Sequence, residues 1–296
     1  MNNYLDLSIN EIHDLLVKKI IKPIDLVNEA FTRIDNDDLN CFITLDKEGA
    51  ISRAKSLENE VPDNILWGIP IALKDNIMTK GIRTTAGSKM LCDFVPVYSA
   101  HVVDLINKKG MIIVGKLNMD EFAMGSSNQT SYFGPVKNPW NKSLVSGGSS
   151  GGSAASISSR LVPFTLGSDT GGSIRQPAAF CGTVGLKPTY GRVSRYGLIA
   201  FASSLDQIGP ITRNVLDNAL LLNILCSKDE RDLTQIGKEE DFTSLIGKDI
   251  SGMKIAIPSF YVSDVIDKEI LDKFNSIKSL LEEKGCFFDV VDIPYI

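Results

Sequence analysis

Two tracts of the sequence combine glycine with serine in a way that could serve acyl-transfer chemistry. Residues 143–159 include Ser146, Ser149, Ser150 and Ser153, and residues 166–177 include Ser168 and Ser173. Glycines beside a serine let backbone N–H groups approach a substrate carbonyl closely and form an oxyanion hole. A serine hydroxyl is a weak nucleophile until a base removes its proton. The two tracts therefore indicate acyl transfer by a serine, provided that the chain supplies such a base.

Lys74 is the candidate for that base. It follows the apolar, strand-like run at 69–73 and precedes Asp75. Burial at the end of a strand would disfavour the charged ammonium, lower its pKa and leave a neutral amine at about pH 7. The alternative is a lysine that extends from the strand end into solvent, and composition alone favours that alternative.

Other kinds of catalytic site find little support in the residue types present. The chain has two histidines, His13 and His101, which we expect to be surface or helix-capping residues, so a Ser-His-Asp triad is hard to build. No His, Cys and carboxylate residues have the spacing of a metal site. The first Gly/Ser tract lacks the Gly-Lys-Ser/Thr ending of a phosphate loop, and the G-x-G-x-x-G pattern is missing as well. We therefore expect neither a metal nor a nucleotide in this chain.

Composition and charge narrow the class of protein further. The 296 residues are 43% apolar and carry a net charge of −5, which suits a large soluble domain and offers no basic surface for nucleic acid. The five cysteines are odd in number and form no C-x-x-C pair, so reduced thiols are expected rather than disulfides or zinc. Neither a signal peptide nor an apolar run of roughly 18 residues is present. These features predict a cytoplasmic protein without a membrane partner.

The elements that must position Lys74 and the serines follow from hydrophobic periodicity. A capping box at Ser8 predicts a first helix, and Pro23 opens a second. A short strand at 41–45 and a polar helix at 50–58 follow. Further on, apolar runs alternate with helical patterns, which predicts an α/β fold with a central mixed sheet covered by helices on both faces. The runs lie at 69–73, 111–114, 162–166, 254–258 and 287–291, and the helical patterns at 101–109, 214–226 and 267–283.

The Gly/Ser tract at 143–159 has the composition of a flexible linker. It runs directly into patterned sequence on both sides, however, so we interpret it as a tight functional loop. We accordingly predict one domain over residues 1–296, with a helical segment at about 1–60 packed on the α/β core.

The residues 147–155 (GGSSGGSAA) and 167–177 (GSDTGGSIRQP) together resemble the amidase signature family, at matching internal spacing. The resemblance covers nearly all of the chain and implies the amidase-signature fold. It also implies a Ser–cis-Ser–Lys triad: Ser173 is the nucleophile, Ser149 bridges after a cis bond from Gly148, and Lys74 is the base. The backbone N–H groups of Thr170, Gly171, Gly172 and Ser173 are the implied oxyanion hole.

Two further groups near the signature are assigned by the same resemblance. Met124, Gly125 and Ser126 correspond to a segment that lines the substrate pocket, although simple loop structure is an equal alternative. Asp169 and Arg175 flank the nucleophile, and we interpret them as a structural ion pair that holds the loop.

Within the family, residues 117–125 and 187–210 are most similar to the A subunits of tRNA-dependent amidotransferases. This implies that Ser173 attacks the side-chain amide of glutamine and that ammonia passes to a partner subunit, which amidates glutamate already attached to tRNA. The implied assembly is a heterotrimer with B and C subunits. ATP and Mg²⁺ would be used through the partner, which would also make most of the tRNA contacts, and this chain would bind no cofactor.

Members of this family extend well past the position that corresponds to Ile296. We therefore expect the C-terminal part of the family domain to be missing, together with the residues that grip glutamine, and the chain alone to be poorly active. Two alternatives remain open: a stand-alone amidase for a small carboxamide, and an inactive fragment. The choice between glutamyl-tRNA and aspartyl-tRNA as acceptor does not follow from this sequence.

Overall fold

In the computed structural model, the described residues are 3–238, 240–263 and 265–293. The chain divides into two compact units, Met1–Ser244 and Leu245–Ile296, and each is described by itself. The prediction of a single domain over 1–296 stays a prediction.

The first unit begins with helices whose ends the sequence signals clearly. After a short 3₁₀ turn, η1 (Tyr4–Asp6), helix α1 (Ile9–Val17) starts at Ser8, whose side chain and Glu11 form the predicted capping box. Helix α2 (Pro23–Asp35) starts at the predicted proline, and α3 (Lys47–Leu57) covers the predicted polar helix. The apolar faces of α1 and α2 are buried in the core.

A six-stranded mixed sheet forms the centre of this unit, in the order β1-β3-β2-β4-β6-β5. Strands β2 and β3, and β2 and β4, are parallel, whereas β1 and β6 run antiparallel to their neighbours. The predicted α/β class and the predicted mixed sheet are therefore confirmed. The strands are β1 (Phe42–Leu45), β2 (Pro70–Lys74), β3 (Ile112–Leu117), β4 (Phe164–Asp169), β5 (Val184–Gly185) and β6 (Gln207–Thr212).

Strand β6 does not follow from the sequence patterns, because it contains Gly209 and Pro210, which argue against a central strand. Both residues lie where β6 meets the chain segment around Leu186. A Cβ on Gly209 would lie 2.1 Å from the carbonyl oxygen of Leu186, so only glycine permits this approach to the chain that carries β5. Pro210 lacks an N–H, but its carbonyl still accepts a hydrogen bond from the N–H of Leu186.

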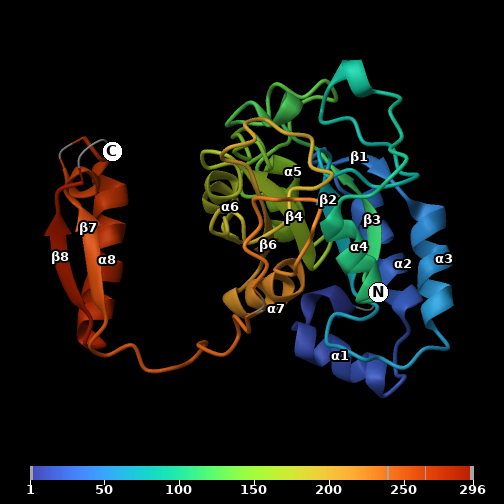
Figure 1. Cartoon of the computed structure of the whole chain (residues 1–296), viewed down its shortest axis with the longest axis horizontal. Coiled ribbons are helices and arrows are strands. Elements are labelled where there is room, and N and C mark those ends of the chain that lie inside the picture. The colour runs from blue at the N-terminus through green and yellow to red at the C-terminus, as the bar shows by residue number, and fades with distance from the viewer. Residues whose placement is uncertain (1–2, 239, 264, 294–296) are drawn as a thin grey trace. The chain divides into compact units, whose positions relative to one another are not determined.

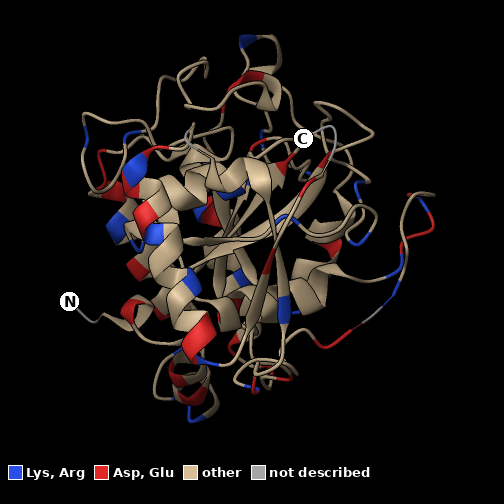
Figure 2. Ribbon diagram, turned by 90° about the vertical axis from the view of Figure 1, so that its left-hand side faces the viewer, with Lys and Arg blue, Asp and Glu red and all other residues tan. Residues whose placement is uncertain are grey.

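Helices pack on the sheet as shown in Figure 1: α3 lies against β3, α5 (Gly151–Ser158) against β4, and α7 (Val215–Leu225) against β6. The remaining helices of the unit are α4 (His101–Lys108), α6 (Arg175–Cys181) and the short turns η2 (Lys89–Leu91) and η3 (Glu121–Ala123). Figure 2 shows Lys and Arg interspersed with Asp and Glu along the helices and loops of the chain.

Helix α5 corrects the expectation that residues 143–159 form a loop throughout, because only the part before Gly151 is a loop. The glycine that lowers helix propensity is required by packing. A Cβ on Gly152 would lie 2.6 Å from the carbonyl oxygens of both Asn118 and Cys41. The small residues of this tract therefore let a helix approach neighbouring backbone closely, and the whole of α5 except Ser158 is buried.

The second unit is a parallel pair of strands with one long helix. Strands β7 (Lys254–Pro258) and β8 (Phe287–Val291) pair in register, and α8 (Lys268–Glu283) connects them after the turn η4 (Ser259–Val262). The sequence predicts this helix and both strands. Within this unit, apolar side chains of α8 and β7 line a cavity with Phe288.

Candidate active site

Lys74 is the last residue of β2, and its side chain is fully buried. Its Nζ lies 2.6 Å from Ser149 Oγ, 3.0 Å from Ser168 Oγ and 3.3 Å from the carbonyl oxygen of Ser168. The alternative of a lysine that extends into solvent is therefore excluded by the geometry.

Burial lowers the pKa of Lys74 from 10.5 to about 7, because the charged ammonium loses its hydration. The negative charges of Asp120, Asp169 and Asp206 raise the pKa and oppose this effect without overcoming it. The amine is thus partly neutral at neutral pH, which is the form that can accept a proton.

Ser149 lies in the loop before α5, and the peptide bond between Gly148 and Ser149 is cis, the form that the resemblance implies. The loop is tied down on both sides. The N–H of Gly148 donates to Gln176 Oε1 at 3.1 Å, and the N–H of Asp120 donates to the carbonyl oxygen of Ser149 at 3.2 Å. Ser149 itself is fully buried, so its hydroxyl is held next to Lys74 away from bulk water.

Ser173 lies between β4 and α6, in the turn that ends the second Gly/Ser tract. The N–H of Ser150 donates to its carbonyl oxygen at 3.1 Å, which brings the turn directly beside Ser149. The side chain of Ser173 is 8% exposed, more than that of Lys74 or Ser149, both at 0%. Of the three predicted catalytic residues, Ser173 is thus the one nearest to solvent.

The turn that carries Ser173 is organised by Asp169, at the end of β4. Its carboxylate accepts hydrogen bonds from the N–H groups of Gly172, Ile174 and Arg175 and forms a two-pronged ion pair with the Arg175 guanidinium. Burial alone would raise the pKa of Asp169, but these donors hold it below its usual value. The predicted structural role of this ion pair agrees with these contacts.

The predicted oxyanion donors are not equivalent in the structure. The N–H of Gly172 donates to Asp169 Oδ1 at 2.7 Å and is already engaged. Within the described part of the chain, the N–H groups of Gly171 and Ser173 have no acceptor. Thr170 is oriented by its hydroxyl, which donates to Asp206. The N–H group of Thr170 likewise has no acceptor among the described residues, so Gly172 is the one predicted donor that is already engaged.

Met124, Gly125 and Ser126 lie on an exposed loop after η3. The next residues of that loop approach Gly148, the residue before Ser149: a Cβ on Gly148 would lie 2.9 Å from the backbone nitrogens of Ser127 and Asn128. The segment that resemblance assigns to the substrate pocket thus borders the loop that carries Ser149.

Sequence reasoning assigns no role to three residues that the fold brings to this site. Asn76 donates to Ser168 Oγ at 2.9 Å, and Asp120 accepts from the N–H of Asn128 at 2.9 Å. Asp206 accepts from Thr170 and from the N–H groups of Phe201 and Ala202. In the sequence, each of the three is distinguished only as a polar residue close to apolar residues.

The two histidines lie away from Lys74. His13 is half-buried, and His101 begins α4 but is buried, contrary to the expectation of a surface residue. The Arg231 guanidinium lies 2.9 Å and Asp229 Oδ2 3.5 Å from His101 Nδ1, and Ser227 Oγ lies 3.1 Å from Nε2. These contacts hold the ring in place and include none of the predicted catalytic residues.

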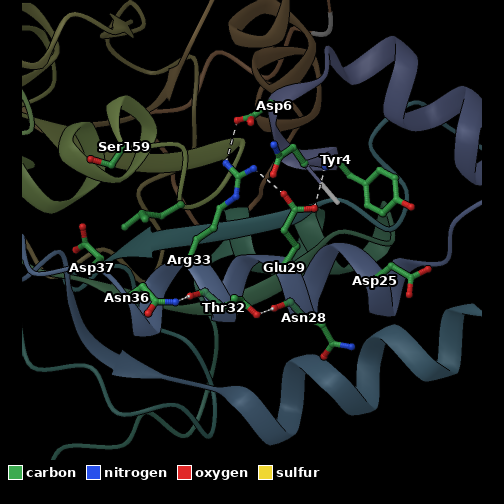
Figure 3. Close-up of a pocket in the computed structure, with 12 residues that line it drawn as sticks. Tyr4, Asp6, Asp25, Asn28, Glu29, Thr32, Arg33, Asn36, Asp37 and Ser159 are labelled. Atoms are coloured by element: carbon green, nitrogen blue, oxygen red, sulfur yellow. Dashed lines mark hydrogen bonds and ion pairs between the residues drawn. The ribbon is translucent and has the colours of Figure 1, made fainter. Parts of the chain in front are cut away.

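A cavity of about 600 Å³ lies over α2 and is lined by none of the predicted catalytic residues. Figure 3 shows the Arg33 side chain directed toward Asp6 and Glu29, and both contacts are ion pairs, at 3.0 and 2.6 Å. Glu29 also accepts the N–H groups of Tyr4 and Leu5. These charges serve to fasten the N-terminal segment, so the cavity is not the candidate active site.

Among the described residues, no group of three or more His, Cys, Asp or Glu side chains is arranged to hold a metal ion. The same residues include no helix with the length and apolarity that crossing a membrane requires.

Comparison with known proteins shows the family to which the chain belongs. The family model described as Amidase matches residues 25–296. The chain belongs to the amidase family. The match begins at α2 and includes β2 with Lys74 and both Gly/Ser tracts.

Curated members of the amidase family are similar over nearly the whole chain. The A subunit of the glutamyl-tRNA(Gln) amidotransferase from Pediococcus pentosaceus is 52% identical over 98% of this chain and 61% of its own length. The protein of the same name from Listeria monocytogenes is 53% identical with the same coverage. The chain thus spans about three fifths of the length of these relatives, 61%.

Solved structures of amidases share the fold. The A subunit of the glutamyl-tRNA(Gln) amidotransferase from Thermotoga maritima has a TM-score of 0.88 at 44% identity, covering 99% of this chain and 63% of that one. A peptide amidase from Stenotrophomonas maltophilia has a TM-score of 0.90 at 29% identity, with the same coverage. The mixed sheet and its helices are therefore those of amidase-signature structures.

Proposed function

We propose that this chain is the glutamine-hydrolysing A subunit of a tRNA-dependent amidotransferase. The observation that carries the proposal is the 2.6 Å contact between Lys74 Nζ and Ser149 Oγ in a fully buried setting, beside the turn of Ser173. The amidotransferase relatives at 52 and 53% identity support the choice of substrate.

In the proposed reaction, neutral Lys74 accepts the proton of Ser149, and Ser149 accepts the proton of Ser173. Ser173 Oγ then attacks the side-chain amide carbon of glutamine, and the N–H groups of Thr170, Gly171 and Ser173 stabilise the oxyanion. When the tetrahedral intermediate collapses, the Lys74 ammonium returns its proton through Ser149 to the departing nitrogen, and ammonia leaves. Water then attacks the glutamyl ester by the same relay and releases glutamate. Met124, Gly125 and Ser126 border the proposed substrate pocket.

The proposed assembly has B and C subunits. The ammonia would react with glutamate on tRNA(Gln), activated by ATP and Mg²⁺ in the partner subunit, which would also make most tRNA contacts. We place this reaction in the cytoplasm, where tRNA is charged.

The test is ammonia release from glutamine, measured for the chain alone and with B and C subunits, ATP and charged tRNA. We expect release that depends on the partners and falls by roughly 10³-fold or more in Ser173→Ala, because removal of a nucleophile leaves only the remainder of the site. Equal release by Ser173→Ala would contradict the assignment of the nucleophile.

A second candidate is a stand-alone amidase. It is favoured by the peptide amidase structure and by an aryl acylamidase structure with a TM-score of 0.89 at 31% identity, which fit this fold as well as the amidotransferase structure does. A panel of carboxamides without partners separates the two: turnover of a non-glutamine amide that is unaffected by B and C subunits would favour this candidate.

A further inference from the structure

A second lysine is buried in the sheet, and the proposed reaction does not use it. Lys116 lies on β3, paired with Leu73 of β2, and it is fully buried like Lys74. Its side chain extends to the chain segment 75–87, hereafter the β2 loop, which leaves β2 immediately after Lys74.

The partners of Lys116 can only accept hydrogen bonds. Its Nζ donates to the carbonyl oxygen of Ile77, to Thr84 Oγ1 at 2.9 Å and to Thr79 Oγ1 at 3.2 Å. The hydroxyl of Thr79 donates its own hydrogen to Ile77, and that of Thr84 donates to Ile82. All three N–H bonds of an ammonium are thus used, and no partner offers a proton to a neutral amine.

This arrangement differs from that of Lys74, whose nearest partner is the Ser149 hydroxyl, a group that can donate. Burial lowers the pKa of Lys116 to about 8, while the negative charge of Asp75 raises it and favours the ammonium. A buried charge of this kind carries a desolvation cost, which its hydrogen-bond partners and Asp75 must offset.

The β2 loop connects Lys116 to the proposed active site. Asn76 adjoins the Ile77 carbonyl that Lys116 holds, and its Nδ2 donates to Ser168 Oγ at 2.9 Å. Ser168 Oγ is also 3.0 Å from Lys74 Nζ. The two ends of the loop are joined by Asp75, its first residue, whose carboxylate accepts hydrogen bonds from the N–H and the hydroxyl of Thr85.

We infer that Lys116 is a positioning residue: its ammonium fixes the β2 loop, so that Asn76 holds Ser168 and Ser168 keeps Lys74 directed at Ser149. The catalytic consequence rests on the proposed Ser–Ser–Lys relay. The fixing of the loop rests only on the contacts of Lys116.

The experiment replaces Lys116 by methionine, which has a similar length but no charge and no N–H. Lys108→Met is the matched control, because Lys108 is exposed at the end of α4. For each full-length protein we would measure hydrogen exchange of the β2 loop amides, the melting temperature, and the rate of Ser173 labelling by a small sulfonyl fluoride. Labelling yields a maximal rate and a half-saturating concentration separately.

In Lys116→Met we expect exchange of the β2 loop about tenfold faster than in the wild type, since its anchoring hydrogen bonds are gone. We expect the maximal labelling rate to fall by about tenfold or more with the half-saturating concentration changed by less than about twofold, because alignment and not binding is lost. The melting temperature should fall, because three buried acceptors lose their donor, so exchange and labelling are measured at temperatures where the variant is fully folded. If the β2 loop of Lys116→Met exchanges at the wild-type rate, or if Lys116→Met is labelled at the wild-type rate, the inference is overturned.

If Lys116→Met does not fold, Thr84→Val replaces it, since valine keeps the shape of threonine and removes one acceptor of Lys116. We expect faster loop exchange and slower labelling in the same direction, and no change in either overturns the inference. The exchange measurement also separates the two proposals. Wild-type protein that resists labelling contradicts the relay, while faster loop exchange in Lys116→Met and not in Lys108→Met still supports the positioning of the loop.

Discussion

Lys74 and Lys116 occupy neighbouring strands and are both fully buried, yet the groups around them differ. Burial lowers the pKa of both, to about 7 for Lys74 and about 8 for Lys116. Lys74 lies beside the Ser149 hydroxyl, which can donate a hydrogen bond. Lys116 instead lies beside the hydroxyls of Thr79 and Thr84, which already donate to carbonyl oxygens, and beside the carbonyl oxygen of Ile77. The chemistry of a buried lysine is thus set by the direction of its hydrogen bonds as much as by its pKa.

The first prediction concerns the protonation state of Lys74. Because the neutral amine is the base, labelling of Ser173 should rise with pH through about 7 and then level off. Lys74→Arg should abolish this rise and lower the labelling rate by roughly 10²-fold or more, since a guanidinium keeps its proton. Lys55→Arg on α3 is the exposed control.

The same shift has a consequence for stability. The folded-state pKa of Lys74 lies below the value of 10.5 for a free side chain, so the folded protein binds fewer protons than the unfolded chain between these values. The contribution of this group to the free energy of unfolding therefore rises with pH from about 7 to 10.5.

The labelling rate of Ser173 tests the role of Lys74 between about pH 6 and about pH 8, on the order of one unit on each side of its pKa of about 7. A labelling rate that stays constant over this range would argue against Lys74 as the base.

At the scale of elements, close backbone contacts position the two loops of the site. Helix α5 approaches Asn118 and Cys41 at Gly152, and this fixes the helix whose N-terminal end follows Ser149. The Asp169 carboxylate fixes the second loop by gathering its N–H groups around one anion. The geometry of the serines is therefore set by glycine packing on one side and by a buried carboxylate on the other.

The second prediction compares two glycine substitutions by thermal and denaturant unfolding. Gly152→Ala should lower the free energy of unfolding by about 1–3 kcal/mol or more, because the methyl group would overlap backbone atoms that cannot move away. Gly171→Ala meets open space and should change the free energy of unfolding by less than about 0.5 kcal/mol. Equal stability of the two variants would mean that α5 can shift without cost.

At the scale of the molecule, the first unit contains its own core. Nearly all of the buried apolar residues lie within Met1–Ser244, and in the second unit the described exceptions are Ile257 and Cys286. Lys74, Ser149 and Ser173 also lie within the first unit. The first unit therefore supplies all three residues of the proposed relay.

The third prediction follows from this division. Lys248 is exposed in a segment without helix or strand, so brief trypsin treatment should cleave there early. We expect the fragment that ends at Lys248 to unfold cooperatively and to retain labelling of Ser173, as judged by mass spectrometry and calorimetry. Loss of cooperative unfolding after this cleavage would show that the first unit needs the rest of the chain.

Elements with strong local signals could be predicted from the sequence: α1 from its capping box, α2 from Pro23, and most of the strands from their apolar runs. The candidate catalytic residues followed from the two Gly/Ser tracts and their resemblance to a family. The predictions of these helices and strands are confirmed, because a cap, a proline or an apolar run acts through residues adjacent in the chain.

The tertiary structure alone set the features that depend on residues far apart in the chain. It placed α5 in a tract that has the composition of a loop and β6 through Gly209 and Pro210, because close backbone contacts there outweigh local propensity. It engaged the N–H of Gly172 with Asp169, and it joined Asn76 to Ser168, 92 residues away. Hydrogen-bond direction at Lys74 and Lys116 belongs to the same class, since it depends on which distant groups the fold brings within about 3 Å.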